Sequence, residues 1–316
     1  MKALFFNGFG NSDVLKYGEL PDPVISSSEL LVEMDYIGLN YADVYRRKGN
    51  YHIEERSPYI NGYEGIGTVI ALGSTVADFK LGDKVFFVDV PFSNASLVAV
   101  PEANAIKVPN DMDPKLVASI GLQGLTADFL AHDLGDDTRG SDVFVHGISG
   151  GVGQILSQML TADGLNVYGV TSSGEKRQLA LKQGAKKVFL RSSNWQMDYL
   201  SSFDTVYDGI GITLLDSISI LKNRGKVVFF GMAGGTPPTV DLVELLSQSK
   251  SILTGDLWDY LTSSEERNQR SSRLFDYFRK EKITISEPTI FSLANGKEAH
   301  EFLESGKSVG KILLKP

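Results

Sequence analysis

The stretch that decides the fold is Asp142-Val-Phe-Val-His-Gly-Ile-Ser-Gly-Gly-Val-Gly-Gln154. An apolar run opens it, Gly147, Gly150 and Gly153 follow at three-residue spacing, and a helical pattern of apolar residues comes next. Glycine permits a tight turn and a close approach of the backbone to a pyrophosphate, which the start of the helix then attracts. Although glycine triplets also occur in ordinary structural turns, the strand–turn–helix context predicts a dinucleotide site.

Beyond this stretch, β-rich runs alternate with helical patterns. The expected strands are 165–170, 187–190, 203–209 and 226–231, and the expected helices are 175–183 and 214–221. This alternation predicts an α/β domain with a doubly wound parallel sheet.

Composition sets the class of protein. The chain has 316 residues, enough for about two domains, and a net charge of −8, which argues against nucleic acid or an anionic membrane as the main partner. It has no cysteine, so disulfides and thiolate zinc sites are excluded. Because the N-terminus lacks a signal-peptide pattern and no apolar run approaches the ~20 residues of a spanning helix, we expect a cytoplasmic protein.

The N-terminal region reads as mostly β. Expected strands are 2–6, 29–36, 65–72, 83–88, 97–100 and 105–108, with one short helix at 43–47. A connection at 110–118 leads to a helix with Thr126 near its start. The tail holds a long helix, 263–280, and a last strand, 309–314, and we expect it to pack on the N-terminal region. The predicted domains are therefore 1–116 with 256–316, and 117–255.

Several motifs now stand in a specific order: Gly38-Leu-Asn-Tyr-Ala-Asp-Val-Tyr45, Gly62-Tyr-Glu-Gly-Ile-Gly67, Leu81-Gly-Asp-Lys-Val85, Gly124-Leu-Thr126, Gly147-Ile-Ser-Gly-Gly-Val-Gly153, Tyr207-Asp208 and Phe230-Gly231. In this order they resemble the medium-chain dehydrogenase/reductase superfamily, and within it the zinc-free NADPH:quinone oxidoreductases related to zeta-crystallin. The resemblance implies a Rossmann domain and a GroES-like β domain that includes the C-terminal tail, with the active site in the interdomain cleft.

Departures from the zinc alcohol dehydrogenases predict that no zinc is bound. Those enzymes carry a cysteine where this chain has Asn40, and a histidine where it has Tyr63, just before Glu64. Their four-cysteine structural lobe is missing, and the four histidines of this chain are scattered.

The residues after the second expected strand favour NADPH over NADH. NAD enzymes place an acidic residue there for the ribose hydroxyls, whereas this chain reads Val170-Thr-Ser-Ser173. Ser172 can donate to a phosphate, and Lys176 and Arg191 supply positive charge. The alternative is that these are ordinary surface polar residues.

We therefore expect an oxidoreductase that transfers hydride from NADPH to a quinone or similar activated acceptor. An NADPH-dependent 2-alkenal or enone (enoyl) reductase is the first alternative, and a non-catalytic NADPH-binding protein is the second. The resemblance also implies a homodimer, for which the fifth expected strand, from Phe229 onward, offers a sheet edge.

The resemblance implies roles for individual residues. Asn40, Tyr45 and Tyr51 are the candidate catalytic residues; helix capping for Asn40 and packing for the tyrosines are the alternatives. Asp43 is expected to be structural. Lys311 is expected to lie on the solvent face of the last strand, and the alternative is that it reaches the cofactor cleft. The expected cofactor contacts are Tyr41, Thr126, Phe129, Ser149, Gly150, Gly151, Val152, Gly153, Ser172, Lys176, Arg191, Gly231, Met232, Leu257 and Trp258.

Overall fold

The computed structural model describes all 316 residues and divides them into two compact units. Unit 1 comprises Met1–Leu122, Leu261–Ser271 and Ser286–Pro316, and unit 2 comprises Gln123–Tyr260 and Ser272–Ile285. The chain changes unit within the helices α2 (Pro114–Phe129) and α7 (Ser264–Arg279). The domain boundaries expected from the sequence stay a prediction about independently folding parts.

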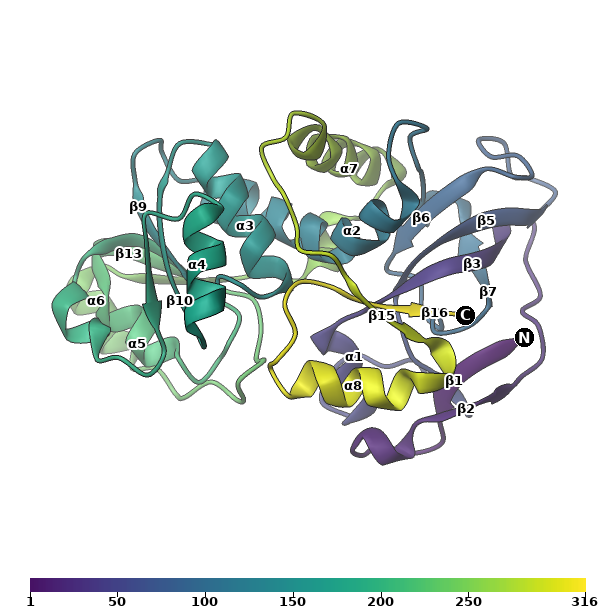
Figure 1. The fold of residues 1–316 in the computed structure, drawn as a ribbon, viewed down its shortest axis with the longest axis horizontal. Coiled ribbons are helices and arrows are strands. Elements are labelled where there is room, and N and C mark those ends of the chain that lie inside the picture. The colour runs from purple at the N-terminus through teal and green to yellow at the C-terminus, as the bar shows by residue number, and fades with distance from the viewer. The chain divides into compact units, whose positions relative to one another are not determined.

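Unit 2 is built on a six-stranded parallel sheet (Figure 1). In order across the sheet, its strands are β11 (Lys187–Leu190), β10 (Asn166–Thr171), β9 (Asp142–His146), β12 (Phe203–Asp208), β13 (Leu221–Phe229) and β14 (Ser251–Thr254). Numbered along the chain, this order is 3-2-1-4-5-6, which is the order of dinucleotide-binding Rossmann domains. The predicted α/β class with a doubly wound parallel sheet is confirmed.

Helices α3 (Gly151–Ala162), α4 (Gly174–Lys182), α5 (Leu214–Ser219) and α6 (Leu242–Gln248) connect these strands. Helices α3 and α4 pack against β9, β10 and β11, whereas α5 packs against β12 and β13. The central strand β9 is buried along Val143, Phe144 and Val145, each 0 % exposed, because helices cover a parallel sheet on both faces.

Unit 1 is β-rich. Its larger sheet runs β15 (Thr289–Ser292), β16 (Ile312–Lys315), β3 (Glu29–Leu39), β5 (Glu64–Leu72), β6 (Lys84–Val88) and β8 (Ala105–Lys107), and β7 (Leu97–Pro101) also pairs with β3. A three-stranded sheet contains β2 (Lys16–Glu19), β1 (Lys2–Phe6) and β4 (Tyr59–Ile60). Helices α1 (Tyr41–Arg47) and α8 (Gly296–Glu304) complete the unit. Because β16 pairs antiparallel with β3, the C-terminal strand completes the sheet of the N-terminal region.

Two expectations about elements are wrong. Thr126 lies near the C-terminal end of α2, because that helix begins at Pro114, inside the segment expected to be a connection. Phe229 is not at a sheet edge, because β14 pairs with β13 in register Phe229↔Thr254 and occupies the edge. No helix is long and apolar enough to cross a membrane.

Candidate functional site

The glycine turn after β9 brings the start of α3 directly onto the strand. Gly147 has a φ of +62°, and a Cβ at Gly153 would collide with the Gly147 carbonyl oxygen. Gly150 is the residue before the helix, and its N–H donates to the Gly147 carbonyl at 2.8 Å. The first N–H groups of a helix have no partner within it, so the start of α3 can accept an anion, as a pyrophosphate site requires.

Most of the predicted cofactor residues lie at the carboxyl ends of the strands of the unit 2 sheet. All strands of a parallel sheet have their carboxyl ends on the same side of the sheet. The residues that follow these ends are Ser149–Gly153 after β9, Ser172 after β10, Arg191 after β11, Gly231 and Met232 after β13, and Leu257 and Trp258 after β14. In an open α/β sheet, ligands bind at the carboxyl ends of the strands, at the point where the strand order reverses. Here that point lies between β9 and β12.

A positively charged corner lies at the ends of β10 and β11. Thr171 and Leu190 are paired in register, so Ser172 and Arg191 both follow directly from adjacent strand ends. Lys176 lies in the first turn of α4, and its pKa is lowered by burial and by the positive charge of Arg191. Two neighbouring cations repel each other, and an anion bound between them would offset this repulsion.

The aromatic residues expected near the nicotinamide have defined positions within unit 2. Phe129, the last residue of α2, is 1 % exposed and stacks on the Tyr260 ring, with 4.7 Å between centroids. Leu257 is buried and Trp258 is half-buried, both in the 3-10 helix Leu257–Tyr260.

A buried polar cluster in unit 1 contains Asn40, Glu64 and Lys311. The Lys311 ammonium lies 2.6 Å from Glu64 Oε2 and 2.9 Å from Asn40 Oδ1, and Asn40 Nδ2 donates to Glu64 Oε2 at 2.8 Å. The other Glu64 oxygen accepts the Leu122 N–H at 2.7 Å. The expectation that Lys311 faces solvent is wrong, since the residue is 2 % exposed.

This cluster also fixes the start of α1. The Asn40 N–H donates to Asp43 Oδ2 at 2.9 Å, so the Asp43 carboxylate closes the first turn as in a capping box. Burial raises the pKa of Asp43 to about 6, although the charge of Arg46 opposes this rise. The Asn40 amide, a candidate donor to an acceptor with helix capping as the alternative, contacts Glu64 and Lys311.

Three tyrosines expected at the site follow one another along α1 and the segment after it. The Tyr41 and Tyr45 rings lie 6.3 Å apart, and the Tyr45 and Tyr51 rings 6.2 Å apart in an edge-to-face arrangement. The Tyr41 hydroxyl donates to the Leu303 carbonyl at 3.0 Å. Tyr45 and Tyr51 are both half-buried.

The residues where the zinc dehydrogenases bind their metal do not fit zinc. Asn40 and Tyr63 replace the cysteine and histidine, and the Glu64 carboxylate is already paired with the Lys311 ammonium. No group of three histidine, cysteine or acidic side chains is placed to hold a metal ion.

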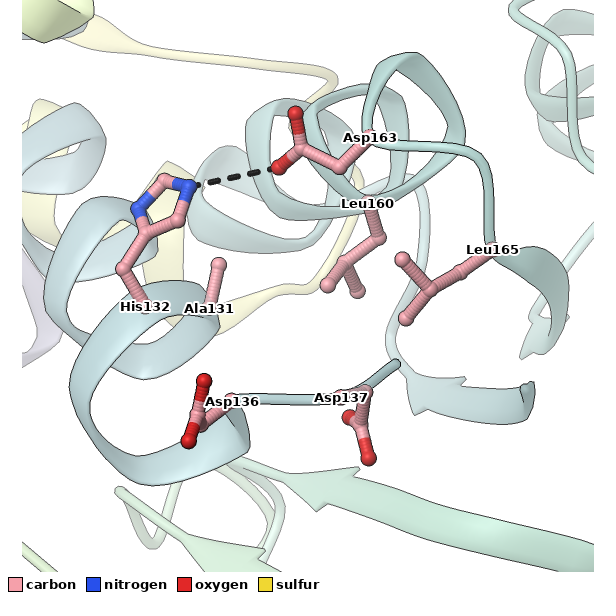
Figure 2. A pocket seen from close by; sticks show the side chains of 7 residues that line it. All are labelled: Ala131, His132, Asp136, Asp137, Leu160, Asp163 and Leu165. Atoms are coloured by element: carbon pink, nitrogen blue, oxygen red, sulfur yellow. Dashed lines mark hydrogen bonds and ion pairs between the residues drawn. The ribbon is translucent and has the colours of Figure 1, made fainter. Parts of the chain in front are cut away.

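A cavity of about 260 Å³ lies near the amino ends of β9 and β10 in unit 2 (Figure 2). It is lined by Ala131, His132, Asp136, Asp137, Leu160, Asp163 and Leu165, which lie before β9, before β10 and at the end of α3. Burial alone would lower the pKa of His132, but its hydrogen bonds to Asp128 and Asp163 raise it to about 9. The cavity is therefore separate from the predicted cofactor residues at the carboxyl ends of the strands. Its histidine is hydrogen-bonded to Asp128 and Asp163.

Local sequence patterns did not reveal the pairing of Glu64 with Lys311. Glu64 stood in a quoted motif, but nothing local indicated its partner, which is 247 residues away. The sequence showed only that Lys311 is a charged residue directly before an apolar strand. A lysine in such a place is more often exposed than buried in an ion pair.

The chain is similar to known proteins over nearly its whole length. Residues 26–110 match the alcohol dehydrogenase GroES-like domain, and residues 151–268 match the zinc-binding dehydrogenase family. A probable quinone oxidoreductase of Schizosaccharomyces pombe is 35 % identical over 96 % of this chain and 94 % of its own length. A 2-haloacrylate reductase of a Burkholderia species is 30 % identical over 89 % and 88 %.

Among solved structures, the Escherichia coli quinone oxidoreductase complexed with NADPH superposes with a TM-score of 0.96. It is 28 % identical to this chain, and the superposition covers 100 % of both chains. The expected pairing of a GroES-like and a Rossmann domain is therefore confirmed as a fold class.

Proposed function

The chain belongs to the quinone oxidoreductases of the medium-chain dehydrogenase/reductase superfamily, and we propose that it transfers hydride from NADPH to a quinone or similar activated acceptor. That it is an oxidoreductase follows from its relatives over nearly the whole chain. The observation that carries the choice of cofactor is the corner formed by Ser172, Lys176 and Arg191, where no carboxylate follows β10.

The phosphate-binding parts of unit 2 support NADPH. The glycine turn and the start of α3 suit the pyrophosphate, and the paired cations suit a phosphate on the adenine ribose. A carboxylate after β10 would favour NADH, because it would accept from the ribose hydroxyl and repel a phosphate. Relatives solved with NADPH are consistent with the proposal.

NADPH, when bound, supplies a hydride from its nicotinamide ring. The chain has to orient the acceptor, exclude water and balance the charge that arises when the hydride's two electrons enter the acceptor. Negative charge then develops on the acceptor oxygen and needs a donor. We assign that role to the phenol of Tyr45 or Tyr51: its O–H bond breaks, the proton forms the new O–H bond of the product, and water returns a proton to the phenolate.

An electron-poor acceptor fits this site because Asn40, Tyr63 and the paired Glu64 do not form a site for a metal that would polarise an ordinary carbonyl. The neighbouring Glu64 carboxylate is paired with the Lys311 ammonium, so it is not free to bind a metal ion. Quinones and alkenes conjugated to a carbonyl accept hydride without that assistance.

The test follows NADPH oxidation with 1,4-benzoquinone, 9,10-phenanthrenequinone and a 2-alkenal, with NADH in parallel. We expect turnover with the quinones and a clear preference for NADPH. Turnover with NADH alone would overturn the cofactor assignment, and no turnover despite tight NADPH binding would favour a non-catalytic NADPH-binding protein.

A 2-alkenal or enone reductase is the second candidate. The similarity to a 2-haloacrylate reductase favours it, since a haloacrylate is an alkene conjugated to a carboxylate. Turnover restricted to the alkenal in the same assay would establish this candidate in place of the first.

Two further expectations belong with this proposal. We expect a homodimer and a cytoplasmic location. The edge strand β14, which has a neighbour on one side only, supports the homodimer.

A further inference from the structure

Arg46 is a buried cation next to the candidate catalytic tyrosines. It lies in the last turn of α1, directly after Tyr45, and is 1 % exposed. Its guanidinium carbon lies 3.5 Å from the centre of the Tyr63 ring and 5.0 Å from the centre of the Tyr51 ring. The charge is thus held against two aromatic faces, an arrangement that is attractive on electrostatic grounds.

The polar contacts of Arg46 leave its charge poorly compensated. Its Nε donates to the His52 carbonyl at 2.9 Å, whereas neither terminal nitrogen has a hydrogen-bond partner. The nearest carboxylate oxygen, on Asp43, lies 4.0 Å away. Buried donors are almost always paired, so two open terminal nitrogens on a permanent cation require an explanation.

The adjacent residue gives a contrast within the same helix. Arg47 is also buried, but its Nε donates to the Gly10 carbonyl, one terminal nitrogen lies 3.0 Å from His300 Nδ1, and the other pairs with Glu304 at 2.7 Å. Arg47 is therefore a neutralised structural cation, whereas the field of Arg46 remains available to its neighbours.

That field acts on tyrosine hydroxyls. Burial raises the pKa of Tyr63 and of Tyr59, and the charge of Arg46 opposes the rise in both. The Tyr63 hydroxyl is already engaged by Tyr59, at 2.8 Å, and by Glu54. Of the two rings on the guanidinium, Tyr63 is buried and Tyr51 is half-buried, so Tyr51 is the more accessible of the two.

We propose that Arg46 is a positioning residue that holds Tyr51 in place and stabilises its phenolate when Tyr51 gives its proton to the acceptor oxygen. The inference rests on the proposed function and selects Tyr51 over Tyr45 as the donor. The O–H bond of Tyr51 breaks as the acceptor, which has taken up the hydride, gains the proton. A positive charge against the ring favours this step in a low-dielectric environment.

Other charged and titratable groups surround the pair. They are Asp43 and Tyr45 from α1, His52 and Glu54 from the segment after it, Tyr59 from β4 and Tyr63 before β5. A test of Arg46 must therefore separate its effect on Tyr51 from its effects on the others.

The experiment is a double-mutant cycle between Arg46→Met and Tyr51→Phe, with Arg46→Lys as the conservative variant. We expect Arg46→Met to lower kcat roughly 10- to 100-fold with little change in KM, since the loss of general-acid assistance is of this order. Arg46→Lys retains the charge and should restore much of kcat. In the Tyr51→Phe background, Arg46→Met should cause no further loss.

The pH profile gives a second readout. Tyr51 must be protonated to donate, so activity falls at alkaline pH as the phenol ionises. Because removal of a nearby positive charge raises the pKa of a phenol, the alkaline limb of kcat should move to higher pH in Arg46→Met.

Equal losses from Arg46→Met with and without Tyr51 would overturn the inference, as would an unmoved alkaline limb in a folded variant. If the wild-type protein shows no NADPH oxidation with any of the tested acceptors, the proposed function fails separately. The inference is then tested by ultraviolet titration of the phenols, with Tyr51→Phe to assign the Tyr51 transition. That transition should shift to higher pH in Arg46→Met, and an unshifted transition would overturn the inference.

Discussion

The ammonium of Lys311 and the carboxylate of Glu64 form an ion pair at 2.6 Å in which each side chain is 1 % exposed. Gly38 makes room for it, since a Cβ there would collide with both Glu64 Oε2 and the Lys311 side chain. The pair joins the last strand of the chain to β5 and fixes the Asn40 amide between them. The pair and Asn40 thus form a self-contained buried polar cluster.

Breaking this pair should destabilise unit 1. Lys311→Met or Glu64→Gln should each lower the free energy of unfolding by about 3–5 kcal/mol, because each leaves a buried partner uncompensated. Urea denaturation measures the change, and Lys315→Met, on the exposed end of the same strand, is the control. The double variant should lose less than the sum of the two. Strict additivity would contradict the assignment of a coupled pair.

The corner after β10 should select NADPH. Lys176→Ala and Arg191→Ala should each raise the Kd for NADPH about 10- to 100-fold, the range expected for charge-assisted hydrogen bonds. The Kd for NADH should change little, because it lacks the phosphate. Fluorescence titration with both cofactors measures the ratio, and Lys182→Ala, in the last turn of the same helix, is the matched control. Equal losses for both cofactors would show that the two cations do not contact the phosphate.

The glycine turn should tolerate no side chain at Gly153. In Gly153→Ala the new Cβ meets the carbonyl oxygen of Gly147, so the start of α3 must move away from the turn. We expect NADPH affinity to fall more than about 10-fold, with a loss of stability of about 1–3 kcal/mol from overpacking. Gly174→Ala is the control, since a Cβ there meets nothing within 4 Å. If the two variants bind NADPH equally well, the turn does not form the pyrophosphate site.

His132 should make stability depend on alkaline pH. Its pKa in the folded protein is about 9, against an ordinary value near 6.5, so its contribution is fully present below the ordinary value and is lost as pH rises through about 9. Unfolding measured between pH 7 and 10 should show a loss of about 1–3 kcal/mol, and His132→Gln should remove most of this slope. A slope that persists in His132→Gln would assign it to another group.

The edge of the unit 2 sheet should be a contact between two copies of the chain. β14 is the last strand of the sheet, and α6 before it exposes Leu242, Val243 and Leu246 by 74 %, 71 % and 77 %. We expect a dimer in size-exclusion chromatography with light scattering, and Leu246→Glu should shift it to monomer by placing a charge in an apolar contact. Leu81→Glu, at an exposed apolar residue of unit 1, should leave the dimer intact. A wild-type monomer at every concentration would contradict this assignment.

The sequence alone determined the features that depend on local pattern. The glycine turn at 147–153 and the alternation of strands and helices predicted the parallel sheet, because turn geometry and hydrophobic period are set by neighbouring residues. The missing carboxylate after β10 needed no tertiary information either, since the carboxyl ends of parallel strands meet at one edge in any such sheet.

Tertiary structure decided whatever depends on partners distant in the chain. Lys311 was expected to face solvent, and only its pairing with Glu64 makes burial of an ammonium tolerable. We expected β13 to be the edge strand, but the short strand β14, Ser251–Thr254, pairs with β13 and is the edge strand instead. Arg46 and Arg47 are adjacent and identical in type, yet the fold neutralises one with Glu304 and leaves the other against Tyr51. That difference lies in the packing around them and is absent from the local sequence.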